Sequence, residues 1–342
     1  MPSIKRSENK QKADIRLTNH LPKIDRENII SEIVEGLNSD LPSLPSKYFY
    51  DDYGSSLFEK ITSQNEYYPT KTEKSIMKKA LPRVMKSDSP IWKGIEARKL
   101  DIIELGSGDC SKISILLDSI EARLHEKVLY IPVDFSDAAI KKSSRILVRK
   151  YPAIEIHGQV ADFLHHLGDI PEGDRRLLCF FGSTLGNLSR DAGKEFIINI
   201  SQIMKKGDRF ILGLDMVKDR AILEKAYNDD AGVTEKFNKN ILNVINGMID
   251  SDFQPAWFDH DALYNPEKMR IEMHLRANRY NIVRSPYFAE NLSFHKGDSI
   301  QTENSHKFTK SHIEQFAEIS DLHIENIFTD SAGWFNIVEF VR

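Results

Sequence analysis

Residues 99–112, KLDIIELGSGDCSK, place a mostly apolar run directly before two glycines. Residues 101–105 are predicted to form a buried strand of a parallel sheet. Gly106 and Gly108 permit a tight turn and a close approach of a ligand to the main chain. Ser111 is expected to cap the helix that follows. Strand, glycine turn and helix N-terminus together predict a cradle for a nucleotide cofactor.

The same turn discriminates between two kinds of cofactor. A dinucleotide fingerprint requires a third small residue, glycine or alanine, where this chain has Ser111. An NAD-dependent oxidoreductase is therefore disfavoured. Glu104, just before the glycines, suits a cofactor that carries positive charge and no pyrophosphate, such as S-adenosyl-L-methionine (SAM) with its sulfonium, ammonium and ribose diol. A glycine turn with a purely structural role is the alternative.

Composition restricts the class of protein. The chain has 342 residues, of which 40% are hydrophobic, enough for two domains or one large one. Lys plus Arg is 47 and Asp plus Glu is 51, so the net charge of −4 favours neither a nucleic acid nor an anionic membrane as partner. Cys110 and Cys179 form no metal or redox motif, which indicates a reducing cytoplasm. We expect a cytoplasmic monomer without a metal.

Membrane and secretion signals are not evident in the sequence. No apolar run approaches the roughly 18 residues of a membrane-spanning helix. Residues 1–13 lack the apolar core of a signal peptide and are expected to be disordered.

From residue 73 to residue 217 strands and helices alternate, which predicts a parallel sheet covered by helices on both faces. The expected strands are 101–105, 127–135, 155–160, 176–184 and 208–216, with helices capped by Ser136 and Ser189. Ligands bind at the carboxyl ends of such strands. Asp134 is placed there to receive a ribose diol. Asp162 is placed to accept from an adenine amine, with Phe163 beside the ring.

The periodicity changes in the segments 14–72 and 218–307. Helices are expected at 27–37, 55–62, 221–227 and 233–249, and Thr70 with Glu73 is spaced as a capping box. Strands are expected at 270–283, 292–295 and 300–305, the last two joined across 296–298. We expect these segments to form a second, α+β domain over the ligand end of the sheet. Glu303 and Ser305 would share one strand face, although a solvated face is the usual place for a charged residue.

The end of the chain completes the expected sheet. Ser311 and Glu314 are spaced as another capping box, and strands at 322–330 and 334–341 would form a closing hairpin. The fold class is therefore α/β, with a seven-stranded, Rossmann-like sheet of the SAM-dependent methyltransferase type. The expected organisation is a disordered N-terminus (1–13), a substrate-binding domain (14–72 with 218–307) and a SAM-binding domain (73–217 with 308–342).

Several stretches resemble one family, the histidine-specific N-alpha-methyltransferases of the ergothioneine pathway. They run in order over roughly residues 45 to 310, and the pair Trp334-Phe335 also fits. The matching stretches are YFYDDYGSSLFEKIT with EYYPT, ELGSGDCSK, PVDFSDAAI, FFGSTLGNLSR, AYNDDAGVTEKFN, RIEMHLRA and IQTENSHKFT. The resemblance implies that the chain uses SAM to add three methyl groups to the α-amino group of L-histidine, which gives hercynine.

The resemblance also implies roles for individual residues. The SAM pocket would involve Tyr50, Gly106, Lys112, Asp134, Asp162 and Phe163. Tyr50 would also lie near enough to orient the reacting amine, as the catalytic residue. The substrate would be held by Tyr67, Gly182, Asn187, Tyr227, Met273, Glu303 and Ser305. Of these, Tyr67, Asn187 and Tyr227 would hold the amino-acid carboxylate and amine, although the adjacent Tyr68 could exchange roles with Tyr67.

Glu303 and Ser305 would read the imidazole, with Met273 packing nearby. Family members that act on other amino acids differ at these positions, so the residues found here favour histidine. A methyltransferase of the same family that acts on tryptophan, tyrosine or a modified indole amino acid is the alternative enzyme, and Glu303 disfavours an apolar ring. A non-catalytic SAM-binding sensor is a further alternative.

Overall fold

The computed structural model describes residues 15–21, 26–93, 95 and 99–342. The predicted disordered N-terminus, residues 1–13, lies outside this part of the chain. Within it, no helix is both long and apolar enough to cross a membrane. The largest sheet has eight strands in the order β1-β4-β3-β2-β5-β6-β13-β12.

The chain divides into two compact units. The first contains the described residues of Met1–Leu21, Ala80–Cys179 and Ile203–Arg209, and the second contains those of Pro22–Lys79, Phe180–Gln202 and Phe210–Arg342. The predicted domain boundaries rest on changes of periodicity along the sequence, which this division does not test, so they stay a prediction.

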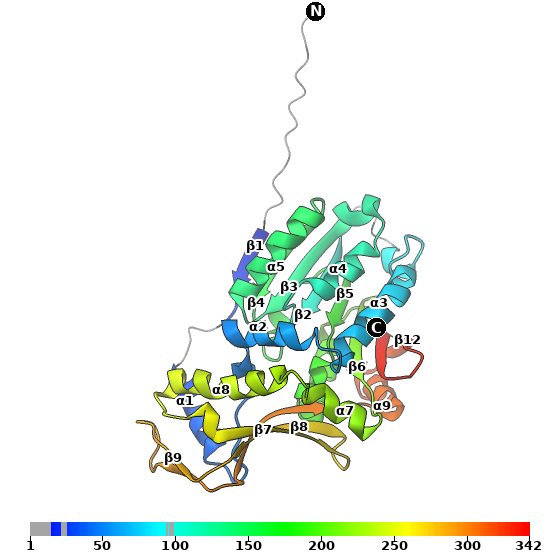
Figure 1. Ribbon diagram of the computed structural model, residues 1–342. Coiled ribbons are helices and arrows are strands. Elements are labelled where there is room, and N and C mark those ends of the chain that lie inside the picture. The colour runs from blue at the N-terminus through cyan, green and yellow to red at the C-terminus, as the bar shows by residue number, and fades with distance from the viewer. Residues whose placement is uncertain (1–14, 22–25, 94, 96–98) are drawn as a thin grey trace, which may run out of the picture. The chain divides into compact units, whose positions relative to one another are not determined.

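The first unit is a parallel βα structure, as the alternation predicts. Helices α4 and α5 lie on its strands (Figure 1). Successive pairs β1/β4, β4/β3, β3/β2 and β2/β5 are all parallel. All six residues of β2 are buried, which explains why its sequence is apolar rather than alternating. The elements are β1 (Ile15–Asn19), β2 (Leu100–Leu105), α4 (Ser111–Asp118), β3 (Val128–Asp134), α5 (Asp137–Lys150), β4 (Glu155–Val160) and β5 (Arg175–Phe180).

The expected count of seven strands is wrong, because β1 adds an eighth at the edge of the sheet. Its sequence, IRLTN, is only partly buried and carries a weak strand signal. Its pairing with β4 joins segments far apart in the chain, and local periodicity does not report such a pairing.

Helix caps in the first unit are partly as predicted. Ser136 caps α5, since its Oγ accepts from the amide of Ala139 at 3.1 Å. The predicted cap by Ser111 is wrong, because Ser111 is the first residue of α4. Asp109, two residues earlier, accepts both the amide (3.0 Å) and the hydroxyl of Ser111, so its carboxylate takes the place of the serine.

The second unit contains the antiparallel strands. Strands β12 (His323–Thr329) and β13 (Phe335–Val341) form the predicted closing hairpin, and β6 (Arg209–Asp215) also belongs to this unit. A separate sheet has the order β11-β8-β7. Its strands are β7 (Phe258–Asn265), which the sequence analysis missed, β8 (Arg270–Ala277) and β11 (Ser299–His306).

The predicted long strand 270–283 is wrong, because it is two strands. At Ala277 the chain leaves the ladder of β8: its amide donates to Asp298 and its carbonyl accepts from Gly297, both at 2.8 Å. The short strands β9 (Asn281–Val283) and β10 (Leu292–Phe294) then pair with each other. The predicted strands 292–295 and 300–305 correspond to β10 and β11, and β11 pairs with β8.

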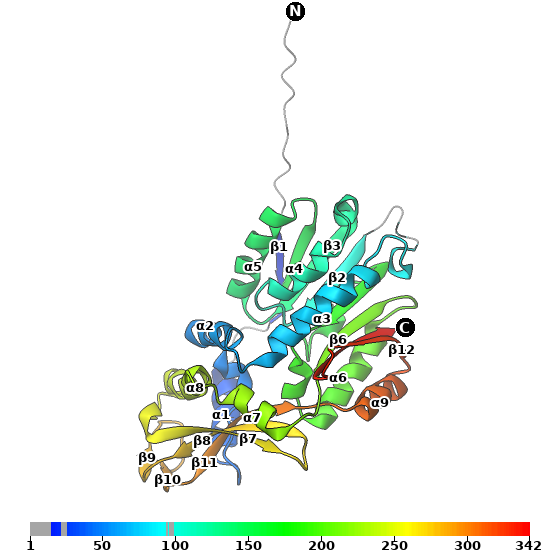
Figure 2. The ribbon, with the colours of Figure 1, turned by 45° about the vertical axis from the view of Figure 1, so that its right-hand side comes forward.

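Helix α8 forms the core of the second unit. It packs on β7 and β8 and against α1 and α2 (Figure 2). Phe237, Ile241 and Ile245 lie on one side of α8 and are almost fully buried. The helices wholly or mostly in this unit are α1 (Arg26–Leu37), α2 (Asp52–Ile61), α3 (Tyr68–Val84), α6 (Arg190–Ile203), α7 (Arg220–Tyr227), α8 (Val233–Ile249) and α9 (Lys310–Ser320).

Two predicted capping boxes are wrong in this unit. Helix α3 begins at Tyr68, before Thr70, because a proline such as Pro69 is tolerated in the first turn. Glu73 instead accepts the amide of Gly182 at 2.7 Å. Helix α9 is capped by Thr309, which has an extended backbone conformation and forms a capping box with His312.

Candidate functional site

The glycine turn has the geometry that the sequence predicts. Gly106 and Gly108 have φ angles of 66° and 45°, in the left-handed region where a side chain would be strained. The amide of Gly106 donates to the carbonyl of Val133 at 2.9 Å, which folds the turn over the end of β3. The backbone of the turn is therefore fixed where a ligand would approach it.

Asp134 closes this turn from the neighbouring strand. Its Oδ2 accepts from the amide of Gly108 and its Oδ1 from the amide of Ser136, both at 2.9 Å. Burial raises the pKa of Asp134, while these two amides oppose the rise. Asp134 thus lies at the predicted end of β3, held firmly against the glycine turn.

The remaining predicted cofactor residues of the first unit are Lys112, Asp162 and Phe163. Asp162 follows β4, and its Oδ1 accepts from the amide of Leu164 at 2.9 Å. Glu104 on β2 is buried and accepts from the hydroxyl of Tyr130. Burial raises the pKa of Glu104 to about 8, and the positive charge of Lys112 opposes that rise.

Glu303 and Asn187 form the centre of the predicted substrate residues. The amide of Asn187, in the 3₁₀ turn Thr184–Asn187, donates to Oε1 of Glu303 at 3.0 Å. Met273 on β8 is the register partner of Glu303 on β11 and is buried. Burial raises the pKa of Glu303 to about 7, while Lys307 and the amide of Asn187 lower it.

Ser305 and Tyr227 meet at a buried lysine that the sequence analysis missed. Lys307 is fully buried, and its Nζ donates to the hydroxyl of Tyr227 at 3.0 Å and to Oγ of Ser305 at 2.9 Å. The hydroxyl of Tyr227 in turn donates to Ser305 at 2.8 Å. Alternation along the strand signals this lysine, because Glu303, Ser305 and Lys307 fall on every second position.

Asp215 balances the charge of Lys307. Its Oδ2 lies 2.8 Å from Nζ of Lys307, and it also pairs with Lys218 and accepts from the hydroxyl of Tyr68. Burial favours the neutral acid, yet the two ammonium groups hold the pKa of Asp215 below its usual value. Sequence reasoning missed Asp215 although, like Asp134, it ends a buried strand.

The adjacent residues Tyr67 and Tyr68 make different contacts. Tyr68 is committed to Asp215 and accepts from Nζ of Lys218 at 2.7 Å. Tyr67 instead lies with its ring centroid 6.0 Å from that of Tyr227. Burial, together with the nearby Tyr227 and Glu303, raises the pKa of Tyr67 well above its ordinary value. Tyr67 therefore shares its surroundings with Glu303.

Tyr50 and Gly182 complete the predicted set. Tyr50 is 44% exposed, and its ring centroid lies 5.8 Å from that of Phe237. Gly182 has a φ of 82°, and the next residue, Ser183, is also left-handed at 57°. This turn lets the hydroxyl of Ser183 accept from the amide of Asp215 at 2.9 Å.

The cluster in the second unit, defined by Tyr67, Asn187, Tyr227, Glu303, Ser305 and Lys307, is called the substrate cluster below. It offers a carboxyl group, hydroxyl groups and an ammonium group in a buried setting, which suits a small zwitterionic ligand with a polar ring. In the part of the chain that the structure describes, no group of three or more His, Cys, Asp or Glu side chains could hold a metal ion.

Comparison with known proteins points in one direction. A family described as histidine-specific, SAM-dependent methyltransferases matches residues 29–342. The chain is 36% identical over 306 residues to a histidine N-alpha-methyltransferase of Mycobacterium tuberculosis, covering 90% of this chain and 92% of that protein. It is 37% identical to the protein of the same name from Mycolicibacterium smegmatis, covering 91% and 94%. It is 25% identical to ergothioneine biosynthesis protein 1 of Schizosaccharomyces pombe, covering 82% of this chain and 36% of that protein.

Proposed function

Because the chain belongs to the histidine-specific, SAM-dependent methyltransferases, we propose that it transfers three methyl groups from SAM to the α-amino group of L-histidine. The product is hercynine, and the reaction is the first step of ergothioneine biosynthesis. The observation that carries the choice of histidine is the half-buried Glu303, held by Asn187 opposite Met273.

The cofactor half of the proposal rests on the glycine turn. Gly106 leaves room for the adenosine to approach the main chain, and Asp134 receives the ribose hydroxyls on the lone pairs that its two amide donors leave free. Asp162 takes the adenine amine beside Phe163, and Lys112 and Tyr50 complete the set. Burial raises the pKa of Glu104 to about 8, and a cofactor that carries a sulfonium and an ammonium would favour its ionised form.

The substrate half rests on the second unit. Glu303 accepts an imidazole N–H or pairs with the imidazolium, and Ser305 contacts the other ring nitrogen. The carboxylate and amine of the amino acid are held by Tyr67, Asn187 and Tyr227. Gly182 lines the site on the substrate side. Lys307 fixes the hydroxyls of Tyr227 and Ser305, so we propose it as a positioning residue.

Methyl transfer is an in-line displacement in which the lone pair of a neutral amine attacks the methyl group of a sulfonium. The protein has to align the two groups and exclude water. Each cycle releases one proton from the ammonium form of the acceptor, which gives the neutral amine, and the attack then forms a C–N bond and breaks a C–S bond. The site must also accept the mono- and dimethylated amines, because three methyl groups are added in turn.

A same-family enzyme for another aromatic amino acid, such as tryptophan or tyrosine, is the second candidate. A buried carboxyl group facing an apolar ring would lose its hydrogen-bond partner, and such unpaired groups give strong discrimination. Glu303 therefore favours histidine over tryptophan.

The test is a turnover assay read by mass. Purified protein is incubated with SAM and either L-histidine, L-tryptophan or L-tyrosine. Histidine should gain three methyl groups and the other two none. Preferred methylation of tryptophan or tyrosine would refute the histidine assignment, and no methylation of any of them would refute the enzyme.

Replacing Asp134 by alanine is expected to weaken SAM binding about tenfold or more, because the ribose diol loses an ionised acceptor. The free amides of Gly108 and Ser136 also lose their partner, so the turn itself loosens. Calorimetric titration with SAM measures the effect, and Asp137→Ala, at an exposed position on α5, serves as the matched control. Unchanged SAM affinity in Asp134→Ala would contradict the proposed role.

Histidine binding is expected to depend on pH through Glu303. The free carboxyl has a pKa of about 7, close to the value of about 6.5 for an imidazole. The bound pair shares one proton. Above pH 7 the free carboxyl group of Glu303 and the free imidazole of histidine are both deprotonated. Binding then takes up the one proton that the pair shares, so the affinity for histidine falls as the pH rises. Below about pH 6.5 both are protonated, and binding releases one.

Calorimetry at pH 8 in two buffers of different ionisation enthalpy measures this proton. Glu303→Gln is the control, because protons exchanged by the substrate amine are common to both proteins. The wild type should take up about one proton more than Glu303→Gln. Equal uptake by the two proteins would show that Glu303 does not share a proton with the ring.

A further inference from the structure

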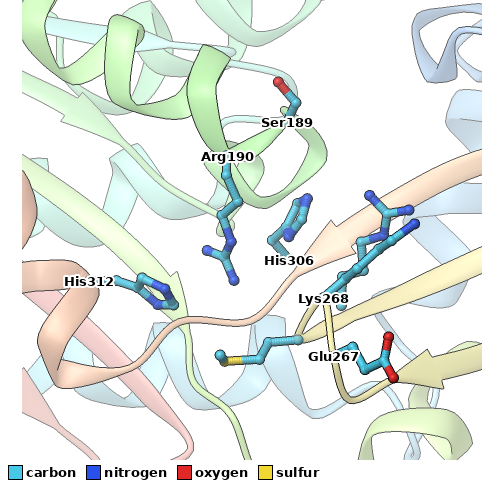
Figure 3. Close-up of a pocket in the computed structure, with 8 residues that line it drawn as sticks. Ser189, Arg190, Glu267, Lys268, His306 and His312 are labelled. Atoms are coloured by element: carbon cyan, nitrogen blue, oxygen red, sulfur yellow. The ribbon is translucent and has the colours of Figure 1, made fainter.

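A cavity outside the substrate cluster is lined in part by His306, which follows Ser305 on β11. It has a volume of about 310 Å³, and its lining includes Ser189, Arg190, Glu267, Lys268, His306 and His312 (Figure 3). We call it the basic pocket. All these residues belong to the second unit, and none has a role in the proposed methyl transfer.

His306 is the buried polar group of this pocket. It stands between Ser305 and Lys307 in the chain, and its side chain points the other way because successive strand residues alternate. It is only 4% exposed, and neither of its ring nitrogens makes a hydrogen bond. Burial and the charges of Arg190 and Arg270 lower the pKa of His306 to about 4, although the nearby main chain of Lys268 opposes this. The ring is thus neutral and offers one donor and one acceptor.

Arg190 brings an unbalanced positive charge to the same space. It is the first residue of α6, a helix of 14 residues, so the free amides of the helix N-terminus add to its field. Its Nη2 donates to the carbonyl of Lys307 at 2.8 Å, while Nη1 is buried and unpartnered. Among the described residues no carboxylate forms an ion pair with Arg190. Figure 3 shows Arg190 and His312 pointing into a common space, with Glu267 on the far side.

His312 offers a further donor. Its Nδ1 accepts from the amide of Thr309 at 3.1 Å, which leaves the proton on Nε2. The basic pocket is therefore lined by donors on Arg190, His306 and His312, and among the described residues Nη1 of Arg190 and the ring nitrogens of His306 have no hydrogen-bond partner. A buried donor without a partner destabilises the protein, so a ligand that accepts from several of these donors is bound favourably.

We propose that the basic pocket binds a small oxyanion, a phosphate or a carboxylate, and that its occupancy tightens histidine binding through Lys307. The backbone of Lys307 is tied to the lining of the pocket: its amide donates to the carbonyl of Met269 at 2.7 Å, and its carbonyl accepts from Arg190. Its Nζ holds Tyr227 and Ser305 in the substrate cluster. An anion that fixes Arg190 also fixes Lys307, and hence the residues that face the substrate.

The first measurement uses anions alone. The full chain, saturated with S-adenosylhomocysteine to fill the cofactor site, is titrated with inorganic phosphate or succinate at constant ionic strength set by sodium chloride. Saturable binding of either is expected, and the tighter of the two identifies the source of the oxyanion. Arg190→Met should abolish this binding, and Lys296→Met, which removes a charge from the exposed turn before β11, should preserve it. Should Arg190→Met fail to fold, Lys268→Ala, at an exposed position, should weaken the binding.

The second measurement is the Kd for histidine, which rests on the proposed function, whereas the anion titration does not. The bound anion should lower that Kd about fivefold in the wild type and in Lys296→Met, and leave it unchanged in Arg190→Met. The proposal is overturned by the absence of saturable phosphate and succinate binding, by equal binding to Arg190→Met, or by an unchanged histidine Kd when the anion is bound. A protein that binds the anion but does not bind histidine would refute the proposed function and leave the anion site standing.

Discussion

Replacing Glu303 by alanine is expected to raise the KM for histidine about 100-fold while the Kd for SAM changes less than about twofold. The imidazole loses its buried acceptor, and the amide of Asn187 loses its partner. A buried hydrogen bond to a charged group that is left unmade costs about 2–3 kcal/mol, and each 1.4 kcal/mol is a factor of ten. SAM lies against other residues in the proposal and should not be affected. Steady-state kinetics with each substrate varied in turn measure both values.

Two variants separate the charge of Glu303 from its shape. Glu303→Gln keeps an acceptor for a neutral imidazole and should raise the KM for histidine less than the alanine variant does. Asn304→Ala changes the next residue of β11, whose side chain interacts with Gln301 rather than with the substrate cluster, and should leave both constants near wild type. Similar losses for histidine and for SAM in Glu303→Ala would show a general structural defect and contradict the role in reading the ring.

Much of the first unit could be predicted because its signals are local. The strand before Gly106 is buried on both faces, and its sequence is therefore mostly apolar rather than alternating. The positive φ angles of Gly106 and Gly108 are the reason that glycine occurs at both positions. Ser136 marks the start of its helix by its side chain alone. Each of these features depends on residues within a few positions of one another.

The wrong predictions concern elements whose pairing or bounds depend on residues far away in the sequence. Strand β1 was missed because its partner is β4, about 140 residues away. The long strand 270–283 was predicted as one element because nothing near Ala277 signals its bonds to Gly297 and Asp298. The predicted cap of α4 is wrong for another reason. Aspartate and serine both suit a capping position, and here the carboxylate of Asp109, not the hydroxyl of Ser111, accepts from the free backbone amide.

The candidate site likewise contains residues that local patterns predict and residues that they do not. Glu303 and Ser305 were placed on one strand face by alternation and by family resemblance, and the structure adds Lys307 to that series. The partner of Lys307 could not be predicted, because Asp215 ends another strand and no local pattern joins the two. A buried ammonium requires a buried carboxylate, but sequence alone does not say which carboxylate it is.

Asp215 is the residue whose loss should cost most stability. It is almost fully buried and faces the ammonium groups of Lys307 and Lys218 and the hydroxyl of Tyr68. Asp215→Ala would remove the carboxylate that forms ion pairs with both buried ammonium groups. Removing one partner of a buried ion pair costs about 3–5 kcal/mol because the other charge stays buried and unpaired. Urea unfolding of the variant should show a loss in this range.

The matched comparison is an ion pair at the surface. Asp261 binds Arg276 at 2.8 Å, but the two side chains are 29% and 44% exposed, and such pairs contribute about 0–1 kcal/mol. Asp261→Ala should therefore unfold close to wild type. If Asp215→Ala lost no more stability than Asp261→Ala, Lys307 and Lys218 would have found water or another partner. Lys307 would then not be held by Asp215, and its place beside Tyr227 and Ser305 would need a different explanation.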